Sequence, residues 1–183
     1  MVLLIFLVFI YQKYRKHEFY YLALGDSIAK GQTPYGEIDK SYSDYVANYL
    51  KEEGVLKFYT NDFAESGQTI KNLILNIENN QKIIINNTPI YLKDALRHAN
   101  LITLSIGAND FFKKVLNYEH DYNSKEKIYV IIDEIKYNLI EVINKIKNYS
   151  NATIILVGYY NPFPNSIQIY SYNLEPIFDY ANE

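Results

Sequence analysis

The sequence contains no cysteine among its 183 residues. Disulfide bonds, thiolate zinc sites, cysteine nucleophiles and lipid-modified cysteines are therefore excluded. Basic residues are not in excess either, because the formal net charge is -3 at pH 7 and no basic stripe stands out along the chain. Nucleic-acid binding is thus not expected, since it normally needs a clustered positive surface. No group of histidines and carboxylates has the spacing of metal ligands, so we expect no metal and no other cofactor.

A hydrophobic run long enough to cross a bilayer is also lacking. Residues 2–10 are apolar without interruption, and Lys13, Arg15 and Lys16 follow them. A membrane-spanning helix needs about 20 apolar residues. A signal peptide normally has a positive charge before its apolar core and a small-residue cleavage site after it, and neither is present here. The run could be a clipped anchor or signal, an interfacial segment or a buried strand.

Of these readings we favour an anchor or signal-like segment over residues 1–16, whose apolar run projects from the domain as a helix. We therefore expect membrane contact through residues 2–11 and a membrane-anchored or extracellular location, with a cytoplasmic location as the alternative. Residues 17–183 are expected to form one domain, because the chain is 49% hydrophobic and 21% charged, as globular chains of this length are.

Within that domain, apolar runs alternate with helical periodicities. We expect strands at 19–24, 55–59, 101–106 and 153–157. We expect helices at 42–53, 69–79, 88–98 and 125–149, and a last helical stretch from near 173. The third helix is expected to start at Thr88, because Pro89 suits the first helical position. This alternation predicts an α/β fold: a three-layer, flavodoxin-like sandwich with a parallel sheet. The chain stops at Glu183 inside the last helix, so we expect the fold to be incomplete at its C-terminus.

Three glycine-containing motifs lie at or beyond the ends of predicted strands. Ser27 follows Gly25 just after the first strand, Gly67 comes after the second, and Asn109 follows the third. The carboxyl ends of parallel strands share one edge of the sheet, so these residues should meet there. Ser27 could act as a nucleophile. Its own N–H, the N–H of Gly67 and the amide of Asn109 could together hold an oxyanion.

The same motifs resemble three sequence blocks of the SGNH (GDSL-type) hydrolase family. The matching residues are 24–27 (Leu-Gly-Asp-Ser), 64–69 (Ala-Glu-Ser-Gly-Gln-Thr) and 106–110 (Ile-Gly-Ala-Asn-Asp), and the resemblance extends from Tyr20 onward. Residues 157–163 are similar to a segment of secreted or membrane-tethered bacterial lipases and esterases. The resemblance implies a serine ester hydrolase of lipase or acylesterase type. It also implies Ser27 as nucleophile, Gly67 and Asn109 as oxyanion donors, and a small-molecule or lipid ester as substrate.

One block of that family is absent. No Asp-x-x-His occurs in the sequence, whose histidines are His17, His98 and His120. His17 precedes the first strand and His98 ends a helix on the wrong side of the sheet, whereas His120 lies on a plausible side. We expect the chain to be an inactive or weakly active fragment, with His120 as base the less favoured alternative. Two other readings stay open: a non-catalytic binding or anchoring domain on this fold, and a phosphate-binding domain that uses residues 25–31. Asp26 and Asp110 are expected to be structural.

Overall fold

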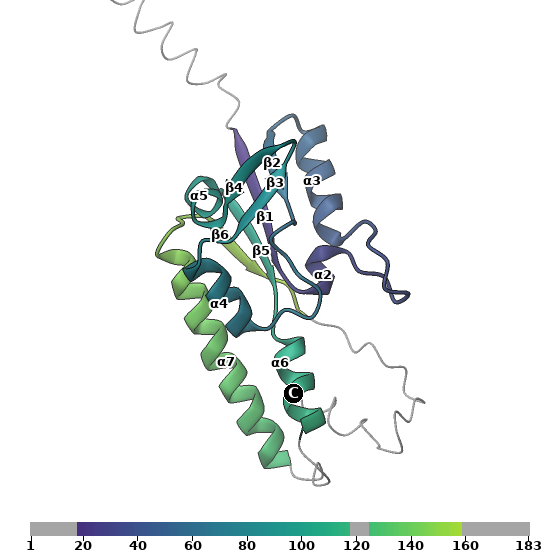
Figure 1. The fold of residues 1–183 in the computed structure, drawn as a ribbon, viewed down its shortest axis with the longest axis vertical. Coiled ribbons are helices and arrows are strands. Elements are labelled where there is room, and N and C mark those ends of the chain that lie inside the picture. The colour runs from purple at the N-terminus through teal and green to yellow at the C-terminus, as the bar shows by residue number, and fades with distance from the viewer. Residues whose placement is uncertain (1–17, 118–124, 159–183) are drawn as a thin grey trace, which may run out of the picture.

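The protein is described from a computed structural model, in which residues 18–117 and 125–158 are placed (Figure 1). A parallel four-stranded sheet lies at the centre, with its strands in the order β2-β1-β5-β6. The strands are β1 (Phe19–Gly25), β2 (Leu56–Thr60), β5 (Leu101–Ser105) and β6 (Thr153–Leu156). All four expected strands are present, and the predicted parallel sheet is confirmed. The apolar run at 2–10 and the helix expected near 173 lie outside the described residues.

Helices cover both faces of this sheet and complete the three layers (Figure 1). On one face lie α2 (Ser27–Lys30) and α3 (Tyr42–Glu52). On the other lie α4 (Ile70–Glu78), α5 (Leu92–His98) and α7 (Lys125–Lys147). The remaining helix, α6 (Ala108–Asn117), follows β5 and packs against the first half of α7 through Val115, Ile128 and Ile131. Neither α2 nor α6 was predicted as a helix.

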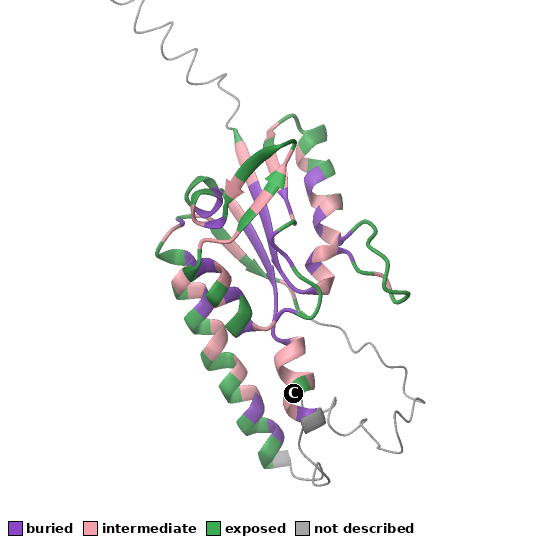
Figure 2. Cartoon of the chain, viewed as in Figure 1, coloured by how far each residue is buried: buried purple, intermediate pink, exposed green. Residues whose placement is uncertain are grey.

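The two faces of the sheet differ in chemistry, because successive strand residues point to opposite sides. Leu22 and Leu24 of β1 and Ile102 and Leu104 of β5 belong to an aliphatic core that includes residues of α4, α5 and α7. All four are fully buried, and the strands stand out as buried in Figure 2. The alternate residues of β1, Tyr21 and Ala23, belong instead to a separate cluster that packs on α3.

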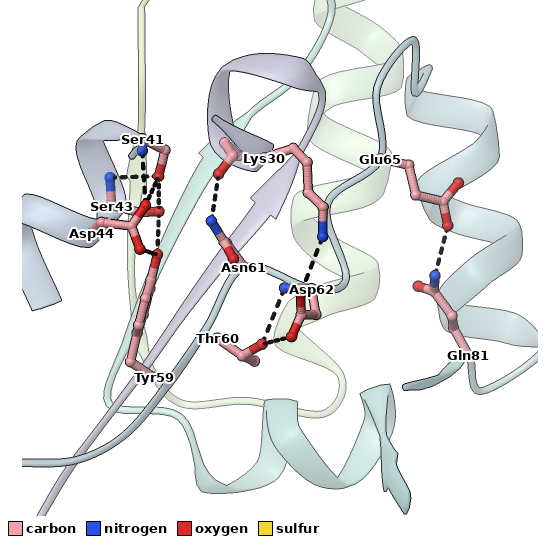
Figure 3. Close-up of polar contacts among 11 residues, drawn as sticks. Lys30, Ser41, Ser43, Asp44, Tyr59, Thr60, Asn61, Asp62, Glu65 and Gln81 are labelled. Atoms are coloured by element: carbon pink, nitrogen blue, oxygen red, sulfur yellow. Dashed lines mark hydrogen bonds and ion pairs between the residues drawn. The ribbon is translucent and has the colours of Figure 1, made fainter. Parts of the chain in front are cut away.

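The face beneath α3 carries a network of buried hydroxyl groups. Thr103 Oγ1 lies 2.9 Å from the hydroxyl oxygen of Tyr21 and accepts a hydrogen bond from the Tyr42 hydroxyl at 3.0 Å. The Tyr59 hydroxyl donates to Asp44 at 3.0 Å and lies 2.7 Å from Ser43 Oγ (Figure 3). Burial raises the pKa of Tyr59 to about 12. These phenols therefore remain neutral donors at physiological pH, and the network ties α3 to the sheet.

Local capping signals explain where two of the helices begin. Ser41 caps α3, and its side chain accepts from the N–H of Ser43. Asp44 reaches back to the N–H of Ser41 at 2.7 Å and completes a capping box. Thr69 caps α4 by accepting from the N–H of Asn72. Both predicted starts are confirmed, because each cap satisfies a backbone donor that the helix itself cannot.

The helix expected to start at Thr88 was wrong. Residues 88–91 form β4 (Thr88–Tyr91), which pairs antiparallel with β3 (Lys82–Ile85), and α5 begins only at Leu92. The reason is the two-residue turn at Asn86 and Asn87, whose φ angles are 48° and 61°. Positive φ at both central residues favours a tight hairpin. Tertiary packing of Ile83 and Ile90 on the main core then outweighs the local Thr-Pro signal.

Candidate active site

The turn after β1 requires a glycine. Gly25 has a φ of +123°, and a Cβ there would lie 1.8 Å from the carbonyl oxygen of Ser105. The next residue, Asp26, donates its N–H to that same oxygen at 2.8 Å. The backbone of β1 therefore leaves the sheet in close contact with the end of β5. No side chain at position 25 could be accommodated without moving one of the two strands.

Ser27 is the first residue of α2, and Asp26 holds it there. The Asp26 side chain is 1% exposed. Its Oδ1 accepts from the N–H of Ile28 at 3.0 Å and from Ser105 Oγ at 3.3 Å. Asp26 is thus the N-cap of α2, as expected for a structural residue. Ser27 itself is half-buried at the carboxyl end of β1.

The second motif lies in the connection between β2 and α4. It is joined to the first motif by the N–H of Glu65, which donates to the Gly25 carbonyl at 3.0 Å. Gly67 is exposed and has a φ of +76°, and among the described residues no heavy atom outside its two chain neighbours lies within 4 Å of the position that a Cβ would take. The left-handed backbone, rather than crowding, is therefore what favours glycine here. In the part of the chain that the structure describes, the space beside Gly67 is open.

The third motif is joined to the second by Asn109. This half-buried residue lies in the first turn of α6, and its Nδ2 donates to the Gln68 carbonyl oxygen at 3.0 Å. Because the acceptor is a carbonyl oxygen, the nitrogen of the Asn109 amide, and not its oxygen, faces the segment that carries Gln68. Because an amide nitrogen carries two hydrogens, the second one stays available to another acceptor. The structure thus links the segments that carry Ser27, Gly67 and Asn109 through two backbone hydrogen bonds and one from the Asn109 side chain.

Asp110 adds a further contact between α6 and the second motif. Its Oδ2 and Oδ1 accept from the N–H of Ile70 at 3.0 and 3.3 Å, at the start of α4. Burial raises the pKa of Asp110 above its ordinary value of 3.8, although the hydrogen bond from Ile70 and the nearby Lys113 and Lys114 act in the opposite direction. Asp110 is therefore a structural link between two helices, as the sequence suggested.

This raised pKa predicts a pH dependence of stability. The folded protein keeps a proton on Asp110 at a pH where the unfolded chain has lost it, so this group lowers the free energy of unfolding as the pH rises above about 4. Asp110→Asn removes that titration. We expect the free energy of unfolding of the wild type, minus that of Asp110→Asn, to fall from pH 4 to pH 6 in urea denaturation. A difference that grows with pH over this range would show that the Ile70 hydrogen bond outweighs burial.

None of the described residues brings a histidine to this edge of the sheet. His98, the one histidine within residues 18–117 and 125–158, ends α5, and its Nδ1 lies 2.8 Å from the Asp94 carbonyl oxygen. Its ring lies 6.1 Å from that of Tyr20, near the start of β1. His98 is therefore at the amino edge, as predicted. His17 and His120 lie outside the described residues.

Two contacts of the candidate site were not predicted from the sequence. Gln68 is only 2% exposed and supplies the carbonyl that orients Asn109. Asn61 donates from Nδ2 to the Ala29 carbonyl oxygen at 3.2 Å, at the end of α2 (Figure 3). A signal for Asn61 was available, because polar residues directly after a parallel strand lie at the edge where sites form.

The comparison with known proteins agrees with these motifs. The sequence model of the GDSL-like lipase/acylhydrolase family matches residues 23–183. The chain belongs to this family. No curated protein sequence matches it.

Solved structures of GDSL-like and related enzymes share the fold. The lipase Lip_vut3 from a goat rumen metagenome has a TM-score of 0.65 and 18% identity, over 90% of this chain and 71% of that one. An extracellular lipase from Streptomyces rimosus has a TM-score of 0.55 and 18% identity, over 90% of this chain and 71% of that one. A mutant of the esterase AlinE4 has a TM-score of 0.50 and 20% identity, over 80% of this chain and 61% of that one. At these identities the likeness shows the fold.

Two other features bear on this GDSL-like chain. In residues 18–117 and 125–158, no group of three or more His, Cys, Asp or Glu side chains could hold a metal ion. Over the same residues, no helix has both the length and the apolar character needed to cross a membrane.

Proposed function

We propose that this protein is a serine ester hydrolase of the lipase or acylesterase type, with Ser27 as its nucleophile. The Ser27 oxygen forms a bond to the ester carbonyl carbon while its proton passes to a general base. The tetrahedral intermediate then collapses to an acyl-enzyme, and the alcohol leaves with a proton. Water attacks the acyl-enzyme in the second half of the reaction and releases the acid. The balance of the reaction is ester plus water to acid plus alcohol.

In this proposal the oxyanion of each intermediate is held by three donors. They are the N–H of Ser27, the N–H of Gly67 and the second amide hydrogen of Asn109. Fixed donors of this kind stabilise negative charge only as it develops, so they lower the barrier without holding the substrate more tightly. The observation that carries the proposal is the bond from Asn109 Nδ2 to the Gln68 carbonyl. This bond joins the Asn109 amide to the residue that follows Gly67, and among the described residues no atom outside the chain neighbours of Gly67 lies within 4 Å of its Cβ position, which supports room for a ligand there.

The family and its neighbours support an ester as the substrate. The matched family is one of lipases and acylhydrolases, and the similar structures are those of lipases and an esterase. We further propose that the 183 residues carry the nucleophile and the oxyanion donors but no efficient general base. The support is that no Asp-x-x-His occurs in the sequence and that His98 lies at the opposite edge of the sheet.

Hydrolysis of p-nitrophenyl acetate and butyrate, with and without added imidazole, tests two proposals: that Ser27 hydrolyses esters, and that the 183 residues lack an efficient general base. Without imidazole we expect no more than about 10³–10⁴-fold acceleration over the uncatalysed rate, which oxyanion stabilisation and binding alone supply in triad enzymes. Imidazole should increase the protein-dependent rate, because it can take the Ser27 proton. His120→Ala should change neither rate.

One control and two outcomes decide between the alternatives in this assay. Protein-free reactions at each imidazole concentration give the rate that imidazole itself produces. Fast hydrolysis that disappears in His120→Ala would show that His120 is the base and that the second part of the proposal is wrong. If neither ester is hydrolysed above background under any condition, the enzyme proposal fails and a non-catalytic binding domain is favoured.

A further inference from the structure

One connecting segment contains the second motif of the proposed active site and contacts the elements that carry the other two. Residues 61–70, the bridging segment, run from the end of β2 to the first residue of α4. At its beginning, Asn61 Nδ2 donates to the Ala29 carbonyl at 3.2 Å, and Asp62 pairs with Lys30 at 3.1 Å. Figure 3 shows Asn61 and Asp62 reaching the short helix α2 from below. The bridging segment therefore contacts the helix that carries Ser27.

The middle of the bridging segment contacts the strand that precedes Ser27. The N–H of Glu65 donates to the Gly25 carbonyl at 3.0 Å. The Glu65 side chain, in turn, accepts from Asn76 Nδ2 at 3.0 Å and from Gln81 Nε2 at 2.6 Å, the latter drawn in Figure 3. Both bonds reach the C-terminal end of α4, so a shift of the middle of the segment would break contacts to that end of the helix.

The far end of the bridging segment is held by α6. Asn109 donates to the Gln68 carbonyl, and the Asp110 carboxylate accepts the N–H of Ile70 with both oxygens. Gly67 lies between the two held ends, and within residues 18–117 and 125–158 no atom outside its two chain neighbours lies within 4 Å of its Cβ position. The N–H of Gln68 donates to the Glu65 carbonyl at 3.1 Å and closes a turn around Gly67, which sets the local direction of the Gly67 N–H. The contacts at the two ends of the segment hold this turn in place relative to α2 and α6.

We propose that Asn61 and Asp110 are positioning residues, which hold the bridging segment at its two ends and thereby aim the Gly67 N–H at the oxyanion formed on Ser27. This rests on the proposed ester hydrolysis, but the holding of the segment is a separate physical property. Loss of either end contact should loosen the whole segment. A misplacement of about 1 Å can reduce turnover roughly 100-fold, so small movements here matter.

Amide hydrogen exchange tests the mechanical part without needing activity. In Asp110→Ala we expect exchange of the Glu65 N–H to speed up at least about tenfold, although Asp110 does not contact Glu65. In Asn61→Ala we expect the same for the Gln68 N–H, which bonds to the Glu65 carbonyl at 3.1 Å. Lys57→Ala is the matched control. It removes an exposed ion pair with Glu18 near the other end of β2 and should leave both rates within about twofold.

Kinetics test the catalytic part. Asn61→Ala and Asp110→Ala should each lower kcat for p-nitrophenyl butyrate about 10- to 100-fold with KM unchanged, because an oxyanion donor acts on the transition state. Asp110→Asn, which keeps a carbonyl acceptor for Ile70, should lie between Asp110→Ala and the wild type. Because a variant could lose its fold, the Leu22 N–H in β1 serves as the internal reference for global unfolding.

The outcomes are distinguishable. If Asp110→Ala changes exchange only at the Ile70 N–H that it contacts, or Asn61→Ala leaves exchange of the Gln68 N–H unchanged, the segment does not act as one unit and the inference is wrong. If exchange changes at the far end but kcat does not, Asn61 and Asp110 hold the segment without positioning a donor, which also contradicts it. If the wild type hydrolyses nothing, ester hydrolysis is the part that fails, and the exchange data alone decide whether the segment is held as proposed.

Discussion

Gly25→Ala is expected to abolish the native fold. The added Cβ would lie 1.8 Å from the Ser105 carbonyl oxygen, and the backbone there has a φ of +123°. Real Cβ atoms never approach a backbone oxygen so closely, so β1 and β5 must separate where they pair at Gly25 and Ser105. A single substitution rarely lowers the free energy of unfolding by more than about 4 kcal/mol, but such a loss is enough to unfold many domains of marginal stability. Soluble yield, circular dichroism and thermal unfolding measure the effect.

Gly36→Ala is the matched control for this prediction. Gly36 also has a positive φ, +85°, but its Cβ position meets no atom within 4 Å. This variant should lose only the conformational term, about 1–2 kcal/mol, and should fold. The contrast isolates the clash from the backbone angle. Equal unfolding temperatures for the two variants would show that β1 and β5 can relax and that the steric argument is wrong.

Asn109→Ala is expected to lower kcat for p-nitrophenyl esters about 10²–10³-fold, with little change in KM. An oxyanion donor stabilises the negative charge that develops on the carbonyl oxygen in the transition state. Its loss therefore raises the activation barrier but does not weaken substrate binding. The substitution also leaves the Gln68 carbonyl without its donor, which should cost about 1 kcal/mol of stability. Steady-state kinetics give the first effect, and urea denaturation gives the second.

Asn100→Ala separates these two effects. The Asn100 side chain accepts a hydrogen bond from the Tyr20 N–H at 2.8 Å, at the amino edge of the sheet. Its loss should lower stability by a similar amount but leave kcat unchanged, because that edge is opposite Ser27. If Asn100→Ala lowers kcat as much as Asn109→Ala does, the loss of activity follows stability and Asn109 is not an oxyanion donor.

The parallel sheet could be predicted because three of its strands, β1, β5 and β6, are short and mostly apolar and all four are separated by longer segments. A sheet covered on both faces buries both sides of its strands, so β5 is buried almost throughout and is apolar except at Thr103 and Ser105. The starts of α3 and α4 were predictable for a different reason. Ser41 and Thr69 cap backbone donors within a few residues, so the whole signal is local.

The features that sequence reasoning missed depend on contacts distant in the chain or on elements too short to show a period. The hairpin β3–β4 exists because Ile83 and Ile90 pack on the main core, and the local signal at Thr88 and Pro89 pointed the other way. Helix α2 spans 4 residues, about one turn, so it has no repeating pattern. Helix α6 carries Phe111 and Val115 one turn apart, a pattern that was too short to stand out beside the motif.

In the candidate site, too, the residues within local motifs could be predicted and the long-range contacts could not. Ser27, Gly67 and Asn109 could be proposed from their motifs, because each motif follows a predicted strand. The groups that hold those motifs together could not be read from the sequence. Asn61 meets Ala29 across 32 residues, and Asp110 meets Ile70 across 40. Such contacts depend on how the strands are ordered in the sheet, which the sequence left undetermined.

Covalent capture of Ser27 is the most direct test of the central claim. The protein is incubated with excess alkyl fluorophosphonate in the presence of imidazole, and the adduct is located by intact mass and peptide mass spectrometry. We expect one phosphonyl group per chain, on the peptide that contains Ser27, and none in Ser27→Ala. Adducts spread over Ser66 and tyrosines, or an equal mass gain in Ser27→Ala, would contradict the assignment of Ser27 as the nucleophile.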